Sequence, residues 1–140
     1  MLVVLDANVL VSAAISPRGV PARIVGEWLD GAFDLIVSPK LLEEVGRNLR
    51  GDRLRGKVSG ERVEQVLEQL RDHAIVADYP VDVEPVVAGD PKDDFVVALA
   101  RVAGASVIVT GDRHLLEVAG LEPSAIRPRE FLAILLRHLR

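Results

Sequence analysis

The feature that most constrains this chain is its alternation of short apolar runs with segments of helical spacing. The first run, Leu2–Leu5, ends abruptly at Asp6, further runs stand at residues 35–37, 74–77 and 106–109, and we expect a short last strand at Ile126. Short continuous apolar runs are typical of strands buried on both faces of a parallel sheet. Because helical segments separate the runs, we expect an α/β fold of three layers, α/β/α, whose central, mostly parallel sheet has four to five strands.

Helices are expected between the strands, where apolar residues recur every three or four positions. The segment after the second strand is the clearest, because Ser38 suits an N-cap and Pro39 suits the first helical position. The other helices are expected at residues 21–30, 61–73, 95–103, 114–119 and 130–139. We expect turns at 16–19 and 90–94, and a loop or helix break over 50–60.

The length of 140 residues predicts a single domain, residues 1–140, with a core of ordinary size. The absence of cysteine excludes disulfides, thiolate metal ligands and a cysteine nucleophile. We find no targeting segment and no apolar run of the ~20 residues that a membrane helix needs. We therefore expect a cytoplasmic protein with no membrane contact.

Acidic residues follow the strands at the positions where parallel sheets bind ligands. Asp6 follows the first strand and Asp112 the fourth, and ligands of open α/β sheets bind beyond the carboxyl ends of strands. Asp93 and Asp94 precede an almost wholly apolar helix, and Glu44 is inside the helix after the second strand. Carboxylates that converge repel one another unless a cation compensates them. Oxygen ligands suit Mg²⁺ or Mn²⁺ rather than Zn²⁺, and such a metal activates water for phosphodiester hydrolysis.

Each acid also has an ordinary structural interpretation. An Asp after a strand, such as Asp6 or Asp112, is a common turn former. Asp93 and Asp94 suit the N-cap of the following helix, and Glu44 suits a solvated helix face. The residue types and spacing alone leave a metal site and a set of caps and turns equally open.

Four motifs, taken together, resemble those of the PIN-domain nuclease family. They are Val3–Leu10, Ser38–Val45, Asp90–Ala100 and Gly104–Asp112, and the ending Arg127–Leu132 is also similar to the family's. Each motif is weak by itself, but all occur in order over nearly the whole chain. The resemblance implies a PIN-like fold and a Mg²⁺- or Mn²⁺-dependent endoribonuclease. It is closest to the VapC-related toxins of type II toxin–antitoxin pairs, which implies an RNA substrate and a protein antitoxin as partners.

The resemblance also implies roles for the acids. Asp6 corresponds to the central metal ligand, Glu44 to the second acid and Asp112 to the fourth. The third acid falls on Asp93 or Asp94, and we favour Asp94 because it stands against the apolar helix. All of these acids are present, and nothing in the motifs points to an inactive relative.

Neighbouring residues are implied to assist. Asn8 and Thr110 match positions that orient the carboxylates by hydrogen bonds, although a turn former and a strand-end residue explain them equally well. Glu43 is the weaker alternative to Glu44, being further round the helix from its apolar face. His114, two residues after Asp112, could approach a phosphate but is more simply a surface residue at a helix start.

A basic stretch after the Glu44 helix is the candidate RNA contact, because phosphates are bound by such side chains. Its members are Arg47, Arg50, Arg53, Arg55 and Lys57. A solvated basic loop is an equally good explanation. The chain carries 21 acidic and 17 basic residues, a net charge of −4, and the four predicted site acids make up this whole excess. The acidity is therefore no objection to an RNA substrate.

The last helix is too apolar for a solvated tail. Its apolar residues are Phe131, Leu132, Ile134, Leu135, Leu136 and Leu139. We expect it to pack on the domain, or to form part of a homodimer or antitoxin contact.

Other classes of function fit less well. A haloacid-dehalogenase-like phosphohydrolase needs a second Asp two residues after the first, where this chain has Asn8. A receiver domain needs an acidic pair after the first strand, which is also missing. A non-catalytic RNA-binding PIN relative is the remaining alternative, and the presence of every acid counts against it.

Overall fold

Five strands form one parallel sheet at the centre of the molecule. The computed structural model describes residues 1–54, 56–77 and 91–138, with only the backbone of residues 91–94. The strand order is β3-β2-β1-β4-β5, and every neighbouring pair is parallel. The strands are β1 (Leu2–Leu5), β2 (Asp34–Val37), β3 (Ile75–Val76), β4 (Val107–Val109) and β5 (Ser124–Ile126). The expected α/β fold with four to five strands is confirmed, and the sheet is parallel throughout.

The central strand β1 is buried on both faces. Val3 pairs with Leu35 on β2 and with Val107 on β4, and Val3, Val4 and Leu5 have 0% exposure. From β1 the chain builds the sheet outward through β2 and β3, and then returns to add β4 and β5 on the other side. The carboxyl ends of β1 and β4 therefore lie at a topological switch point, where open α/β sheets form their ligand crevices.

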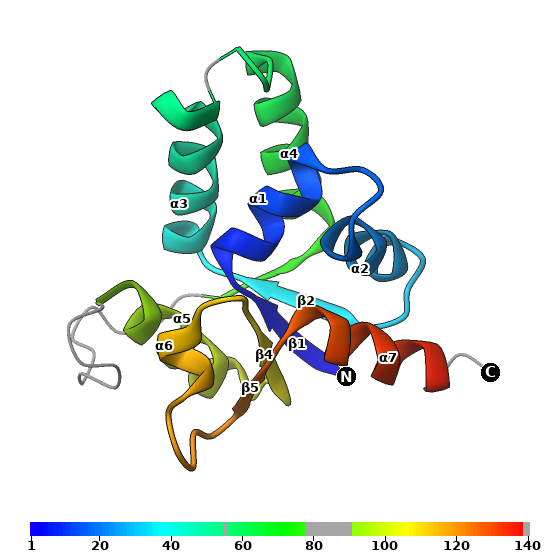
Figure 1. Ribbon diagram of the computed structural model, residues 1–140, viewed down its shortest axis with the longest axis vertical. Coiled ribbons are helices and arrows are strands. Elements are labelled where there is room, and N and C mark those ends of the chain that lie inside the picture. Colours follow the sequence, from blue (N-terminus) through cyan, green and yellow to red (C-terminus); the bar gives the residue numbers. More distant parts are fainter. Residues whose placement is uncertain (55, 78–90, 139–140) are drawn as a thin grey trace.

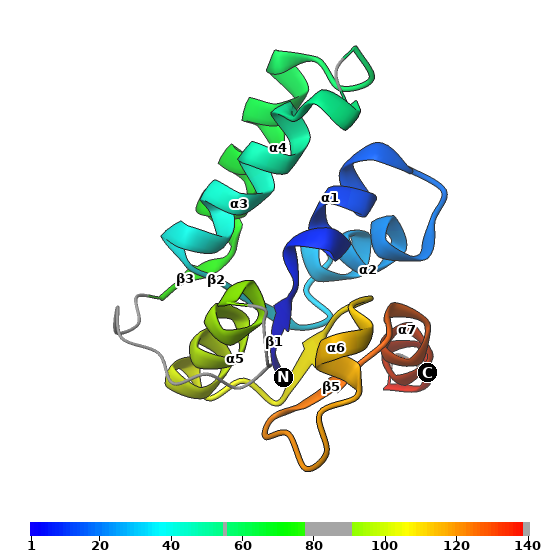
Figure 2. The ribbon, with the colours of Figure 1, turned by 60° about the vertical axis from the view of Figure 1, so that its left-hand side comes forward.

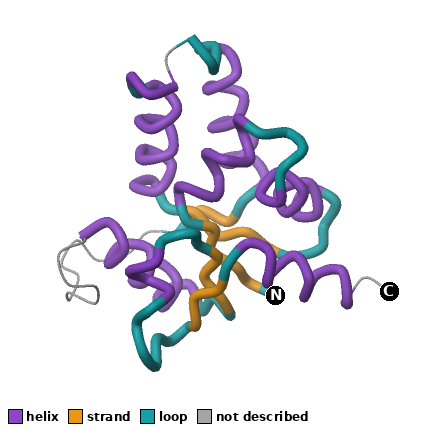
Figure 3. Tube along the Cα trace, in the orientation of Figure 1, coloured by secondary structure: helices purple, strands orange, loops and turns teal. Residues whose placement is uncertain are grey.

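Helices cover both faces of the sheet and extend beyond its carboxyl edge. They are α1 (Ala7–Ile15), α2 (Val20–Leu29), α3 (Pro39–Arg50), the 3₁₀ turn η1 (Asp52–Leu54), α4 (Gly60–His73), α5 (Pro91–Ala103), α6 (Arg113–Leu116) and α7 (Pro128–His138). The helix α5 lies on one side of β1, and α2 and α7 lie on the other (Figure 2). The helices α3 and α4 run side by side away from the sheet (Figures 1 and 3).

The helix α1 was not expected from the sequence. Its nine residues lack a regular polar stripe, because neighbouring elements cover it on more than one side. Ala7, Val9, Leu10 and Val11 are all buried. A helix that is apolar nearly all round gives little 3.6-residue periodicity to detect.

Helix boundaries also differ from the expected ones. The helix α5 begins at Pro91 rather than at residue 95, so the acidic segment interpreted as a turn forms its first turn instead. Proline is favourable at this position, because the first helical residue needs no hydrogen-bonded N–H. The helix α6 ends at Leu116 rather than at residue 119, and α7 begins two residues earlier than expected, at Pro128.

The apolar last helix packs on the domain. Phe131 on α7 is fully buried, and its ring meets that of Phe33 edge to face, with centroids 5.2 Å apart and an interplanar angle of 82°. Leu135, one turn later, is 2% exposed. Such aromatic pairs contribute about 0.5–1.5 kcal/mol beyond the area that they bury. Within the described ranges, no helix is both long and apolar enough to span a membrane.

Candidate active site

Asp6 is a buried carboxylate fixed at the carboxyl end of the central strand. Its backbone N–H donates to the Val109 carbonyl at 2.9 Å, which extends the pairing of β1 with β4 by one residue. Its side chain caps α1, where Oδ1 accepts a hydrogen bond from the Ala7 N–H at 2.8 Å. Asp6 is only 7% exposed. Burying a carboxylate is costly unless hydrogen bonds or cations compensate it, so the neighbours of Asp6 define the site.

Thr110 links Asp6 to the end of β4. Its side chain is fully buried, and its backbone N–H donates to the Ile126 carbonyl of β5 at 3.0 Å. The hydroxyl oxygen lies 2.7 Å from Asp6 Oδ2 and 3.0 Å from the Asp112 backbone nitrogen. Because the Asp112 N–H can only donate, the Thr110 hydroxyl accepts a hydrogen bond from it and donates its own hydrogen bond to Asp6. Thr110 thus orients the Asp6 carboxylate and the loop that carries Asp112 together.

Asp112 is half-buried at the start of α6. It caps this short helix, and Oδ1 accepts from the His114 backbone N–H at 2.9 Å. The other oxygen, Oδ2, takes no hydrogen bond from the part of the chain that the structure describes. His114 is exposed, and its contact with Asp112 is made by its backbone N–H and not by its imidazole ring. Asp112 therefore caps α6 with Oδ1, while Oδ2 is not used in the cap.

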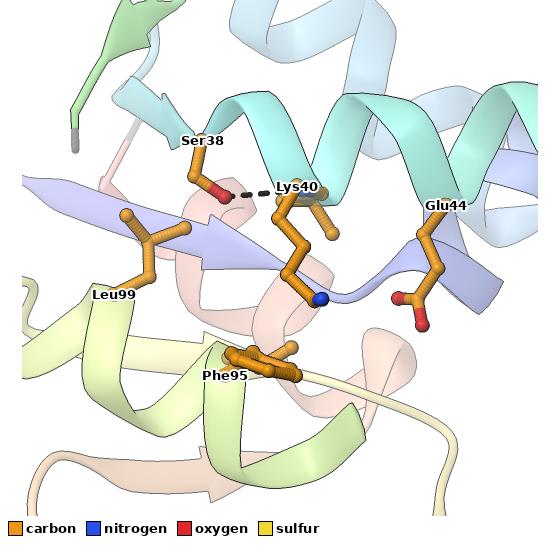
Figure 4. Close-up of a pocket in the computed structure, with 7 residues that line it drawn as sticks. Ser38, Lys40, Glu44, Phe95 and Leu99 are labelled. Carbon is orange, nitrogen blue, oxygen red and sulfur yellow. Dashed lines mark hydrogen bonds between the residues drawn. The ribbon is translucent and has the colours of Figure 1, made fainter. Parts of the chain in front are cut away.

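Glu44 comes to the site from α3. Figure 4 shows its carboxylate on the side of α3 that faces α5, the same side as Lys40. Glu44 is half-buried, whereas Glu43 is exposed and lies 3.9 Å from Arg47 in an ion pair on the helix surface. The helix itself is fixed by Ser38, a residue that is 1% exposed and whose hydroxyl accepts from the Leu41 N–H at 3.1 Å.

The third predicted acid is on the first turn of α5. Asp93 and Asp94 both belong to that helix, but their side chains lie outside the described residues. Among the side chains that are described, no group of three acids or histidines is close enough to hold a metal ion. The described residues thus bring Asp6, Thr110 and Asp112 together and direct Glu44 toward the helix that carries the other two acids.

A family model described as "PIN domain" matches residues 2–114, which run from β1 to the start of α6 and make up most of the chain. The chain belongs to the PIN domain family. The sequence resemblance that carried this expectation is therefore confirmed at the level of the family.

Three comparisons of this PIN domain chain with individual proteins give low sequence identities. The uncharacterized protein MJ1680 of Methanocaldococcus jannaschii is 27% identical over 117 residues, covering 83% of this chain and 74% of that protein. The crystal structure of PAE2754 from Pyrobaculum aerophilum superposes with a TM-score of 0.67 at 22% identity, covering 98% of this chain and 96% of the other. VapBC2 from Rickettsia felis, bound to a promoter DNA fragment, gives a TM-score of 0.62 at 12% identity, covering 91% and 98%. These two likenesses establish the PIN-like fold.

The donor chemistry of this PIN domain suits a hard divalent cation. Asp6 and Asp112 follow the adjacent strands β1 and β4, and Glu44 faces α5 from α3. The chain has no cysteine, and the only histidine near these acids has an exposed side chain. An oxygen-only set fits Mg²⁺ or Mn²⁺, whereas protein zinc sites are typically built around Cys or His ligands.

Thr110 and Asn8, the two residues predicted to orient the carboxylates, differ in their contacts. Thr110 donates to Asp6, whereas Asn8 is exposed on α1 and makes no side-chain hydrogen bond within the described ranges. One neighbour was missed by sequence reasoning, namely Lys40. Its spacing of four residues from Glu44 puts both on one face of α3, and this spacing was the available signal.

The basic stretch extends away from the site toward the tip of the α3–α4 pair (Figure 1). Arg50 lies about 9 Å beyond Glu44 along the helix axis and pairs with Glu64 on α4. Arg53 in η1 and Lys57 after it are exposed, and Arg55 is outside the described residues. The described cations of this stretch therefore lie along the α3–α4 pair and not around Asp6.

Proposed function

We propose that this PIN domain is a divalent-metal-dependent endoribonuclease that hydrolyses RNA phosphodiester bonds. The observation that carries the proposal is the Asp6–Thr110–Asp112 hydrogen-bond network at the switch point of the sheet. It fixes the Asp6 carboxylate and the backbone of Asp112 where parallel sheets bind ligands, and PIN domains are typically nucleases.

In this proposal, Asp6 and Asp112 hold the metal, with Glu44 and either Asp94 or Asp93 completing the acidic set. A bound Mg²⁺ or Mn²⁺ supplies a Lewis acid and an activated water for attack on phosphorus. The Thr110 hydroxyl and the α1 N-terminus fix the orientation of the Asp6 carboxylate, so that no rotation is needed when the substrate arrives. Glu44 approaches from α3 and helps to hold the metal or to orient the water. No covalent protein intermediate is required.

The proposed substrate is RNA, held through its phosphates. The cations of the basic stretch in the sequence, Arg47, Arg50, Arg53, Arg55 and Lys57, are the proposed remote contacts. Two of them, Arg47 and Arg50, already pair with glutamates on the surface. Exposed ion pairs contribute little energy, so a phosphate can replace these carboxylates at small cost.

We further propose that the protein is the toxin of a type II toxin–antitoxin pair, acting in the cytoplasm as a homodimer and as the single domain of residues 1–140. This rests on the resemblance of its motifs to VapC-related proteins and on a fold shared with VapBC2 of Rickettsia felis. The partner would then be a protein antitoxin. A short reading frame beside the gene and co-purification of its product would support this role.

The test of the nuclease proposal is cleavage of a mixed RNA pool in Mg²⁺ or Mn²⁺ by wild type and by Asp6→Asn. Asparagine is also a good N-cap, so this variant keeps the start of α1 while removing the charge. We expect the cleavage rate to fall at least about 100-fold. Mutating residues that only hydrogen-bond to metal ligands already lowers metal affinity or activity about 10–100-fold.

The matched control is Asp34→Asn. Asp34 is an exposed aspartate at the first position of β2, the opposite edge of the sheet. This variant should cleave as wild type does. If Asp6→Asn and wild type cleave RNA equally, the assignment of Asp6 as a catalytic acid is wrong. RNA binding with no cleavage under any metal would favour the non-catalytic alternative.

A further inference from the structure

Lys40 presents a positive charge beside the proposed acidic site. It is the second residue of α3 and is exposed, and its ammonium lies 4.0 Å from the centre of the Phe95 ring on α5. Figure 4 shows Lys40 and Glu44 on the same side of α3, directed toward α5. Among the described residues, no carboxylate lies within ion-pair distance of Lys40. The charge is therefore held in place by an aromatic ring and not neutralised by a described neighbour.

The surroundings of Lys40 limit what it can bind. The small pocket beneath it is lined by Ser38, Lys40, Leu41, Glu44, Phe95, Val96 and Leu99, and its cavity volume is about 10 Å³. This is roughly the room for one water molecule, so no nucleobase can enter. A ligand must instead lie at the mouth of the pocket, on the side of α3 where Figure 4 shows both the Lys40 ammonium and the Glu44 carboxylate. An ammonium offers three N–H donors and binds phosphate as a point charge.

We propose that Lys40 binds a phosphate of the RNA chain next to the bond that is cut, and that Phe95 is the positioning residue that holds Lys40 there. This inference rests on the proposed nuclease function and adds a substrate contact to it. A long, flexible lysine normally loses much rotamer freedom when it binds. Because the contact with the Phe95 ring already restrains Lys40 in the free protein, part of this loss does not occur on binding.

The experiment compares Lys40→Met with Lys40→Arg in the full chain. Methionine keeps most of the apolar stem without the charge, whereas arginine keeps the charge and also stacks on aromatic rings. Binding of a fluorescein-labelled random single-stranded RNA is measured by anisotropy without divalent metal, and cleavage is measured with Mn²⁺. For Lys40→Met we expect Kd and KM to rise about 5- to 20-fold, with a smaller change in kcat. The slope of log Kd against log salt should fall by about 0.7, the loss of one phosphate contact.

Two further variants separate the role of Lys40 from general effects. Phe95→Leu should raise Kd and KM about twofold to fivefold, and Phe95→Tyr should restore them, because tyrosine keeps the aromatic face. Arg137→Met removes one positive charge from the exposed end of α7 and should change neither constant. Thermal unfolding of each variant identifies any loss of fold.

The outcomes distinguish this inference from the proposed function. If wild type cleaves RNA and Lys40→Met has the same KM and the same salt slope, the phosphate contact is overturned and the nuclease proposal stands. Weakened binding in Lys40→Met without cleavage by wild type would support the contact and overturn the nuclease proposal. If wild type neither binds nor cleaves RNA, both are wrong.

Discussion

The Thr110 hydroxyl donates a 2.7 Å hydrogen bond to Asp6 Oδ2 across a separation of 104 residues. The two residues directly follow the neighbouring strands β4 and β1, and both side chains are buried. The same hydroxyl accepts from the Asp112 backbone N–H at 3.0 Å. One threonine thus connects two of the acids to which we assign the chemistry.

Replacing Thr110 with valine should therefore affect both stability and cleavage. Valine has nearly the same shape, but it removes the donor to a buried carboxylate, which costs about 1–3 kcal/mol. Cleavage should also fall about 10- to 100-fold, as for other groups that orient metal ligands. Urea unfolding measures the first effect and RNA cleavage the second. Thr110→Ser keeps the hydroxyl and should recover most of both, and a valine variant as stable and active as wild type would contradict the role.

The serine caps of α3 and α4 allow a comparison of buried and exposed hydrogen bonds. Ser38 and Ser59 each accept a backbone N–H at 3.1 Å, but Ser38 is 1% exposed whereas Ser59 is exposed. Ser38→Ala should cost about 1–2 kcal/mol and Ser59→Ala about 0.5–1 kcal/mol, because water can replace only the exposed cap. The free energy of unfolding of both variants in urea checks this order. Equal costs would show that water reaches the Leu41 N–H after the Ser38 hydroxyl is removed.

The sequence identified the sheet well because its strands are buried on both faces. Residues such as Val3, Ile36 and Ile108 form continuous apolar runs, and a parallel sheet is the ordinary structure that buries such runs. The N-cap Ser38 was likewise visible, since capping depends on local hydrogen bonds that residue types report directly.

The sequence failed where tertiary contacts rather than local patterns decide the structure. The helix α1 has no polar stripe, so its periodicity is weak, and only its burial against α2 and α3 explains it. The acidic segment before Phe95 contains turn formers, yet it starts α5 because Pro91 and acids suit a first helical turn. The contact between Lys40 and Phe95 joins two helices and depends on their packing, which no local spacing encodes.

Glu43 and Glu44 provide a matched pair for the second acid. They are adjacent and chemically identical, but Glu44 faces α5 whereas Glu43 is exposed near Arg47. Glu44→Gln should lower RNA cleavage by at least about tenfold, while Glu43→Gln should leave it within about twofold, since its ion pair is worth less than about 1 kcal/mol. Steady-state cleavage rates at fixed Mn²⁺ measure the difference. The reverse order would move the second acid to Glu43.

Metal binding can be tested without any nuclease assay. A cation that binds only the folded state stabilises it by RT ln(1 + [L]/Kd), which is about 2.7 kcal/mol at a hundredfold excess over Kd. For a chain of this length, that corresponds to a rise in Tm of several degrees. Mn²⁺ should therefore raise the Tm of wild type and of Asp34→Asn, but raise that of Asp6→Asn and Asp112→Asn much less. Sodium chloride at the same ionic strength controls for screening of the net charge of −4. An equal Mn²⁺ response in all four proteins would place the metal elsewhere, and no response in wild type would argue against a metal site of useful affinity in the absence of RNA.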